Sequence, residues 1–294
     1  MPLPTTEALH QQCAIDSLPS LQAAEFALVA QQAALAVVHR ALPEICAGAD
    51  VMADALRAQG IIHYAAAGSS ALMALADCCE LPGTFGISPG ATRFHMAGGV
   101  PTEGKMPGST EDDAEAGAIA GTSADSGDAF LVLSASGSTP YAVAAAKAAK
   151  AKGAKVVSLA NNPDTPLLEC ADVSICLATP AEIVAGSTRL GAGTAQKVAL
   201  NTMSSLMGMR LGHVHKGMMV NVVADNAKLK NRAAKMVAHI SNVSDREARA
   251  ALEATMGQVK PAILVAAGQT SEQAEELLAK HAGHLKPCFV DISN

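Results

Sequence analysis

Residues Leu133–Pro163 read LSASGSTPYAVAAAKAAKAKGAKVVSLANNP: an apolar run, a small polar loop, an alanine-rich stretch and a second apolar run. This order predicts strand, loop, helix and strand, the unit from which parallel sheets are built. A loop between a strand and a helix leaves backbone N–H groups and the positive end of the helix dipole open to an anion, most often phosphate. The alternative is a plain helix cap by Ser138 or Thr139, with Pro140 in the first turn.

The same alternation continues along the chain. Helical patterns cover Leu21–Gln59, with a break near Pro43. Further strands are expected at IIHYAAA (61–67), ATRFHMA (91–97), DAFLVLSA (128–135), AKVVSLA (154–160) and VSICLA (173–178). With helices between them, these strands predict an α/β fold, a doubly wound parallel sheet with helices on both faces.

Past Asn226 the pattern becomes helical, although the periodicity of KPAILVAAG (260–268) fits a helix or a strand. The predicted domains are therefore N-terminal helices packing on the core (1–59), a sheet domain (60–225) and a small helical C-terminal module (226–294). The long helix around TAQKVALNTMSSLMGMRLG (194–212) is expected to be either a buried core helix or one that also offers a face to a second copy.

Composition excludes several classes of protein. The 294 residues carry a net charge of −6 with 2% aromatic residues and no Trp, which disfavours nucleic acid and anionic membranes as partners. No apolar run of about 18 residues is expected to span a membrane, and the N-terminus lacks the features of a signal peptide. Seven cysteines without paired metal spacing fit reduced thiols in a cytoplasmic protein that holds no metal.

Three polar loops follow predicted strands: AAGSS (66–70), SASGSTPY (134–141) and PAEIVAGSTRLGAGTAQK (180–197). Ligands of open α/β sheets bind beyond the carboxyl ends of the strands, so the three loops are expected to meet at one crevice. None of them fits a dinucleotide fingerprint or a P-loop. The candidate substrate- and phosphate-binding residues are Ser69, Ser70, Ser136, Ser138, Thr139, Glu182, Ser187, Thr188 and Arg189.

Several motifs together carry a family resemblance. In chain order they are AAGSS, DCCELPGTFG, AGG with STEDDAEAG, SASGSTPY, NNPDTPL, EIVAGSTRLGAGTAQKVALN and MMVNVVADNAKLKNR. From about Asp16 onward the chain resembles the N-acetylmuramic acid 6-phosphate etherase family, whose core is a sugar-isomerase (SIS) domain. The resemblance implies a cytoplasmic homodimer that binds an amino-sugar 6-phosphate, eliminates D-lactate from C3 and then adds water. It implies no metal or redox cofactor.

Cleavage of an ether β to a carbonyl needs a base for the C2 proton and an acid for the leaving oxygen, and two carboxyls in different environments can supply both. The resemblance implies that Glu80 is the acid and Glu111 the base. The apolar neighbours of Glu80 in CCELPG are expected to keep its carboxyl protonated, whereas Glu111 opens the acidic run EDDAEAG. Read without the resemblance, Glu80 is an ordinary surface residue and Glu111 a first-turn helix acid.

The chain departs from the family pattern at three cationic positions, which here are Leu72, Ser138 and Gly191. Arginine holds phosphate or carboxylate by paired, charge-assisted hydrogen bonds, so neutral replacements weaken that hold. Arg189 and Lys197 remain. One of three other side chains, that of His95, Lys105 or Lys216, could compensate from another direction.

Three functions therefore stay open. The first is an etherase-like lyase that uses both glutamates. The second is an aldose–ketose sugar-phosphate isomerase with His215 as its acid or base. The third is a non-catalytic sugar-phosphate sensor. The two glutamates favour the lyase, and the three neutral positions favour an altered substrate or lost activity.

Overall fold

The chain forms two compact units. The computed structural model describes residues 4–10, 14–222, 224 and 227–293. The sheet unit comprises Met1–Cys78 and Gly90–Ser204, and the helical unit comprises Cys79–Pro89 and Ser205–Asn294. The chain crosses between them three times: within α3 (Gly68–Phe85), at Pro89–Gly90 and within α7 (Gly191–Arg210).

The sheet unit contains the predicted parallel sheet. Its strands are β1 (Ile62–Ala66), β2 (Thr92–Met96), β3 (Ala129–Ser134), β4 (Lys155–Ala160) and β5 (Val173–Cys176). All four pairings are parallel, and the strand order is β2-β1-β3-β4-β5. The predicted α/β fold class is confirmed. The order reverses at β1 and β3, the place where a ligand crevice opens beyond the carboxyl ends of an open sheet.

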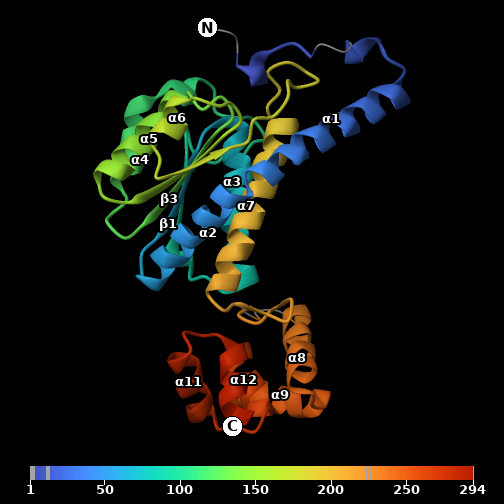
Figure 1. The fold of residues 1–294 in the computed structure, drawn as a ribbon, viewed down its shortest axis with the longest axis vertical. Coiled ribbons are helices and arrows are strands. Elements are labelled where there is room, and N and C mark those ends of the chain that lie inside the picture. Colours follow the sequence, from blue (N-terminus) through green and yellow to red (C-terminus); the bar gives the residue numbers. More distant parts are fainter. Residues whose placement is uncertain (1–3, 11–13, 223, 225–226, 294) are drawn as a thin grey trace. The chain divides into compact units, whose positions relative to one another are not determined.

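Helices cover both faces of this sheet (Figure 1). One face carries α4 (Ala114–Thr122), α5 (Pro140–Ala151) and α6 (Pro166–Glu169), and the other carries α2 (Leu42–Arg57), α3 and α7. Burial of its alanines packs α5 against β3 and β4, because small side chains let the helix come close to the sheet. At Gly117 the backbone of α4 meets that of α5 so closely that a Cβ would collide with the carbonyl of Tyr141.

A buried carboxylate fixes α3 against the sheet. Asp77 is 2% exposed and accepts hydrogen bonds from Tyr64 Oη (2.8 Å), Asn201 Nδ2 (2.7 Å) and Ser204 Oγ (2.8 Å). These donors come from β1 and α7, so one side chain joins three elements. Burial and the neighbouring Asp77 raise the pKa of Tyr64 well above its ordinary value.

Besides the ends of α3 and α7, the described residues of the helical unit form a two-stranded hairpin and five helices. The elements are β6 (Val214–His215), β7 (Met218–Met219), α8 (Ala227–Ser241), α9 (Asp245–Ala254), α10 (Val259–Ala266), α11 (Ser271–Lys280) and α12 (Leu285–Ser293). The ambiguous KPAILVAAG segment is helical and lies in α10. The hairpin was not predicted from the sequence, and α3 continues through Pro82 to Phe85.

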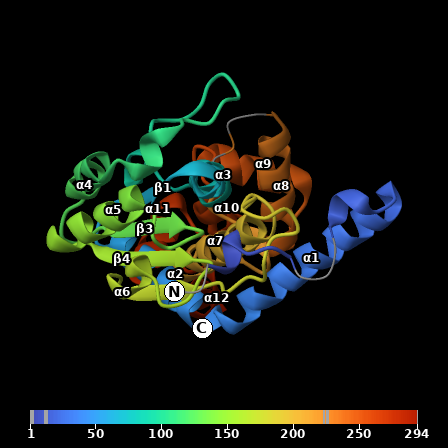
Figure 2. The same cartoon turned by 90° about the horizontal axis from the view of Figure 1, so that it is seen from above.

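Helix α1 (Ser20–Arg40) is strongly apolar and has an exposed leucine face. It is long and apolar enough by length and composition alone to cross a membrane, with a mean hydropathy of 1.4, so the prediction that no segment qualifies was wrong. Leu21, Leu28 and Leu35 are exposed and recur every seven residues, which places them on one face of the helix. In Figures 1 and 2 the first turns of α1 extend beyond the rest of the sheet unit.

The long helix expected around 194–212 corresponds to α7. Its Leu200 and Met203 are buried, so this part of α7 is a core helix.

Two stacked histidines lie inside the sheet. His63 on β1 is fully buried, with Nδ1 at 3.1 Å from His95 Nε2 on β2 and Nε2 at 3.3 Å from Asp128 Oδ2. Their rings are 5.3 Å apart, and His63 also stacks on Phe130. Burial, with His63 and Arg93, lowers the pKa of His95 to about 4. His95 is therefore neutral at pH 7, and the expectation that it supplies a positive charge was wrong.

This pair predicts acid destabilisation of the sheet unit. His95 is neutral in the fold and titrates near its ordinary value when unfolded, so its stabilising effect is present above about pH 6.5 and is lost as pH falls toward 4. We expect a loss of about 2 kcal/mol, less than the full pKa difference because the ring is partly exposed. Near-ultraviolet circular dichroism tests this during denaturant unfolding at pH 7.5 and 4.5, because both tyrosines, Tyr64 and Tyr141, lie in the sheet unit. In the His95→Gln variant the free energy of unfolding should depend less on pH than in the wild type. The same pH dependence in both proteins would contradict the role of His95.

Candidate functional site

The loop after β3 is a cluster of hydroxyl groups at the start of α5. Ser134 Oγ lies 2.8 Å from Thr139 Oγ1 and 3.2 Å from Ser136 Oγ. The backbone N–H of Gly137 donates to Ser134 Oγ, and that of Ser138 donates to Ser136 Oγ. Thr139 stands at the N-cap position and Pro140 begins the helix, but no side chain caps α5. Its first-turn N–H groups therefore stay open to an anion, which favours the anion site over the plain cap.

The loop after β1 lies beside the loop after β3, because these strands are neighbours in the sheet. Gly68 begins α3 with a φ of +55°, and a Cβ at Gly68 would lie only 2.5 Å from Glu111 Oε1. The exposed carboxyl group of Glu111 is thus held against the start of α3. Ser69 and Ser70 follow in the first turn. The structure brings this predicted base to the point where the strand order reverses.

The loop after β5 returns to the same edge of the sheet. A Cβ at Gly193, near the start of α7, would lie 4.0 Å from Met73 Cγ in the first turns of α3. Ser187, Thr188 and the exposed Arg189 lie in the turns just before α7. The three loops therefore converge on one edge, as the sequence predicts.

Glu182 uses its carboxylate to cap α7. The side chain is buried, Oε2 accepts from the N–H of Gly191 and Oε1 from that of Ala192, both at 2.9 Å. These bonds occupy the N-terminus of α7. An internal carboxylate at this position stabilises the helix dipole and competes there with any anionic ligand.

Sequence reasoning did not single out two asparagines at this edge. Asn161 Oδ1 accepts from Gln196 Nε2 at 2.8 Å, which ties the loop after β4 to α7. Asn162 Nδ2 donates to the carbonyl of Ala135, and its Oδ1 accepts from the backbone N–H of Thr5 at 2.8 Å. Both side chains are buried. They position the hydroxyl loop and hold the N-terminal segment at the carboxyl edge of the sheet.

The chain is similar in sequence to several known enzymes. Residues 25–161 match the SIS domain family model. The N-acetylmuramic acid 6-phosphate etherase of Streptomyces avermitilis is 38% identical over 286 residues, covering 96% of this chain and 92% of its own length. The enzymes of the same name from Streptomyces coelicolor (39%; 96% and 92%) and Deinococcus radiodurans (38%; 87% and 85%) match similarly. This chain belongs to the N-acetylmuramic acid 6-phosphate etherase family.

The departures from the etherase pattern are local. Leu72 is partly exposed on α3, and Ser138 Oγ donates to Ser136 Oγ within the hydroxyl loop. Gly191 is buried, and a Cβ there would lie 3.1 Å from both Glu182 Oε2 and the Cβ of Ala34. With glycine at 191, the Glu182 carboxylate interacts with the helix N-terminus where the etherase pattern offers a cation.

Glu80 lies in the later part of α3, the helix whose first residue lies against Glu111. It follows Gly68 by twelve residues within α3. Its side chain is exposed, which agrees with the alternative of an ordinary surface residue, and its role as the acid stays a prediction. In an α-helix Leu81 points to a different side from Glu80 and is the residue that becomes buried.

The other predicted cationic side chains and His215, the catalyst of the isomerase alternative, lie in different parts of the fold. Lys197 is exposed on α7, and Lys105 lies in the glycine-rich loop 98–108, which lines a shallow open depression of about 430 Å³ before Glu111. His215 and Lys216 lie in the hairpin of the helical unit. The His215 ring stacks on Phe289 at 5.9 Å, and burial, with Lys216, lowers its pKa. Within the described part of the chain, no group of three or more His, Cys, Asp or Glu side chains could hold a metal ion.

Proposed function

We propose that this protein is a carbon–oxygen lyase that cleaves the lactyl ether of N-acetylmuramic acid 6-phosphate or of a closely related amino-sugar phosphate. The observation that carries the proposal is the exposed Glu111 carboxylate against the start of α3, beside the uncapped N-terminus of α5. A base and an anion site at the same switch point of the sheet suit a phosphorylated substrate that must lose a proton. Membership of the etherase family names the reaction.

The chemistry assigned to these residues is an elimination followed by an addition. The phosphate is held by the first-turn N–H groups of α5 and by the hydroxyls of Ser136, Ser138 and Thr139. Glu111 removes the proton from C2, and the electron pair forms a C2–C3 double bond as the C3–oxygen bond breaks. Glu80 gives a proton to the departing lactate oxygen. Water then adds at C3 and a proton returns to C2.

We also infer that the enzyme works as a homodimer with shared active sites. Twelve residues of α-helix span about 18 Å, so Glu80 lies far along α3 from the end that Glu111 touches. Two carboxyls that act on C2 and C3 of one sugar must be much closer than this. A second protomer that supplies its own Glu80 resolves the difference, and the leucine face of α1 offers an apolar surface for it.

A proton-exchange assay tests the reaction. The protein is incubated with N-acetylmuramic acid 6-phosphate in deuterium oxide, and lactate release and deuterium at C2 are followed by NMR. Lactate release with deuterium at C2 is the expected result. Exchange without lactate release, together with aldose–ketose conversion of a sugar phosphate, would instead favour an isomerase that uses His215. Binding without turnover of any sugar phosphate would favour a sensor.

The hydroxyl loop predicts a phosphate-specific effect. Thr139→Val removes a hydroxyl that faces Ser134 and Ser136, so the KM for the phosphorylated substrate should rise about 5- to 10-fold, the effect of about one hydrogen bond. The KM for the sugar without phosphate should not change. Thr122→Val on α4 is the matched control, because that hydroxyl bonds only within its helix. Equal effects on both substrates would contradict the assignment.

The leucine face of α1 predicts the assembly. Leu28→Glu places a charge in the middle of this face, and burial of an unpaired carboxylate in an apolar interface is strongly unfavourable. We expect sedimentation of the wild type as a dimer and of Leu28→Glu as a monomer at micromolar concentration. Ile119→Glu on α4 introduces the same charge at another exposed apolar position and should remain dimeric. A wild-type monomer, or a dimeric Leu28→Glu variant, would count against the proposal.

The compartment is part of the same proposal. Six described cysteines form no disulfide bond: Cys46, Cys78, Cys79, Cys170, Cys176 and Cys288. Cysteines outside disulfides are typical of reducing compartments, which supports a soluble cytoplasmic enzyme. On this proposal the exposed face of α1 is covered by a second protomer. The expectation that the reaction needs no metal or redox cofactor stays a prediction.

A further inference from the structure

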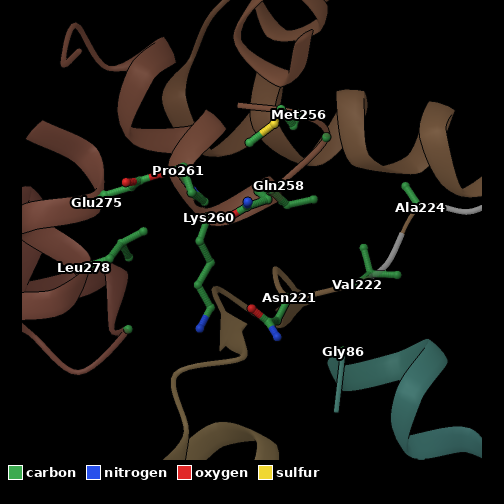
Figure 3. A pocket seen from close by; sticks show the side chains of 13 residues that line it. Gly86, Asn221, Val222, Ala224, Met256, Gln258, Lys260, Pro261, Glu275 and Leu278 are labelled. Carbon is green, nitrogen blue, oxygen red and sulfur yellow. The ribbon is translucent and has the colours of Figure 1, made fainter. Parts of the chain in front are cut away.

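The helical unit contains a cleft of about 580 Å³ that the proposed reaction does not use. Its lining residues all belong to that unit and include Asn221, Met256, Gln258, Lys260, Glu275 and Leu278. The volume suits a small organic molecule. Figure 3 shows Lys260 extending from the start of α10 into the space between Leu278 and Asn221.

Lys260 is an unusual residue for such a position. Its side chain is only 7% exposed, yet within the described part of the chain its ammonium group has no hydrogen-bond or ion-pair partner. Lysine is rarely buried without a partner, because desolvation of an unpaired charge is costly. Burial lowers the pKa of Lys260 to about 8. The ammonium form therefore persists at pH 7 and lacks a counter-charge.

The groups around Lys260 do not neutralise it. His213 lies near it, and burial, with Lys260, lowers the pKa of His213 to about 4. Nδ1 of His213 is buried without a partner. Cys288 interacts electrostatically with Lys260, but burial raises the pKa of its thiol, which stays neutral. Glu275 lines the cleft from the exposed side of α11 and forms no ion pair with Lys260.

The start of α10 adds a second source of positive potential. No side chain caps this eight-residue helix, and its N-cap residue Gln258 lines the cleft. The free N–H groups of a helix N-terminus attract anions. The buried ammonium group and the uncapped helix thus face the same space, which has the volume of a small ligand.

We propose that this cleft is a second ligand site, which binds a small organic anion through the ammonium group of Lys260 and the N-terminus of α10. The shared chemistry is a carboxylate or a phosphate. Met256, Leu278 and Val222 contact the carbon skeleton. The site is distinct in its residues from the hydroxyl loop and Glu111, and does not depend on the proposed reaction.

NMR of the methionine methyl groups in the whole protein reports ligand binding at both sites in one experiment. Met256 lines the cleft, whereas Met73 on α3 lies beside Gly193 at the crevice of the sheet unit. The protein with ¹³C-labelled methionine methyls is titrated separately with sodium phosphate, D-lactate and N-acetylglucosamine 6-phosphate. At least one of these anions should shift the Met256 signal saturably, and the identity of the active probe separates carboxylate from phosphate binding. A Met73 shift alone would leave the proposed function intact and overturn the second site.

Variants and pH link the Met256 response to the lysine. Lys260→Met keeps the length of the side chain and should abolish the response, whereas Lys260→Arg should retain it. Lys235→Met, the same change at an exposed lysine of α8, is the control. In the wild type, affinity should fall as pH rises from 7 to 9.5, by about tenfold per unit above pH 8, because the ammonium group loses its proton. A Met256 response that survives in Lys260→Met, or that ignores pH, would overturn the proposal.

Discussion

Replacement of Glu111 by Gln is expected to abolish exchange of the sugar's C2 proton with solvent deuterium. The amide that replaces the carboxylate cannot accept a proton at neutral pH, and on our proposal no other base faces C2. Since a general base contributes about 10²- to 10⁴-fold, lactate release should fall by at least that range. NMR of the sugar C2 position and a lactate assay measure both quantities. Glu115→Gln, an exposed acid one helical turn later, is the matched control and should retain full rate.

The Glu80→Gln variant should behave differently from Glu111→Gln. It lacks the acid for the leaving oxygen but keeps the base, so lactate release should fall about 10²- to 10⁴-fold while C2 exchange continues. This split distinguishes the two roles, which a simple loss of structure would not. Full rates in both variants would show that the two-carboxylate mechanism is wrong.

The second large effect concerns which protomer supplies each carboxyl. Glu80→Gln and Glu111→Gln chains with different affinity tags are co-expressed, and the mixed dimer is purified. If each active site combines Glu111 of one protomer with Glu80 of the other, the mixed dimer has one intact site and one doubly altered site. It should recover about half of the wild-type activity, as the two-fold symmetry of a dimer requires. The two parent homodimers should stay inactive.

A mixed dimer without activity would place both carboxyls in the same protomer. The position of Glu80 twelve residues along α3 would then have to be reconciled with substrate contact by another route. A mixed dimer made from the wild type and Glu111→Gln provides the scale, because it retains one intact site under either arrangement.

The sheet was predictable because its strands are short, buried apolar runs. β1, β3 and β4 are almost wholly buried, and such runs between helical patterns leave few alternatives. The segment at 260–268 was ambiguous because the periodicity of its short apolar run fits a helix or a strand. The helix that formed buries Lys260, which no periodicity rule anticipates.

The site was only partly predictable, since its loops could be read from local sequence but their partners could not. The SGST segment predicts an anion-binding loop because glycine and hydroxyl residues before a helix leave N–H and hydroxyl groups open to an anion. Asn162 reads as a turn residue in NNP, yet it bonds Thr5, which is 157 positions away. The exposure of Glu80 likewise depends on which side of α3 it occupies. These features are set by tertiary contacts, which sequence spacing does not reveal.

The N-terminal segment has a practical consequence for handling the protein. Thr6 is fully buried; its Oγ1 accepts from Asn162 and its carbonyl accepts from Gly186, so residues 5–7 are packed against two loops at the carboxyl edge of the sheet. A purification tag or fusion partner joined close ahead of Thr5 would lie next to these loops. Crystallisation and kinetic work should therefore use a C-terminal tag, or a tag removed by protease, so that a cloning artefact is not mistaken for weak substrate affinity.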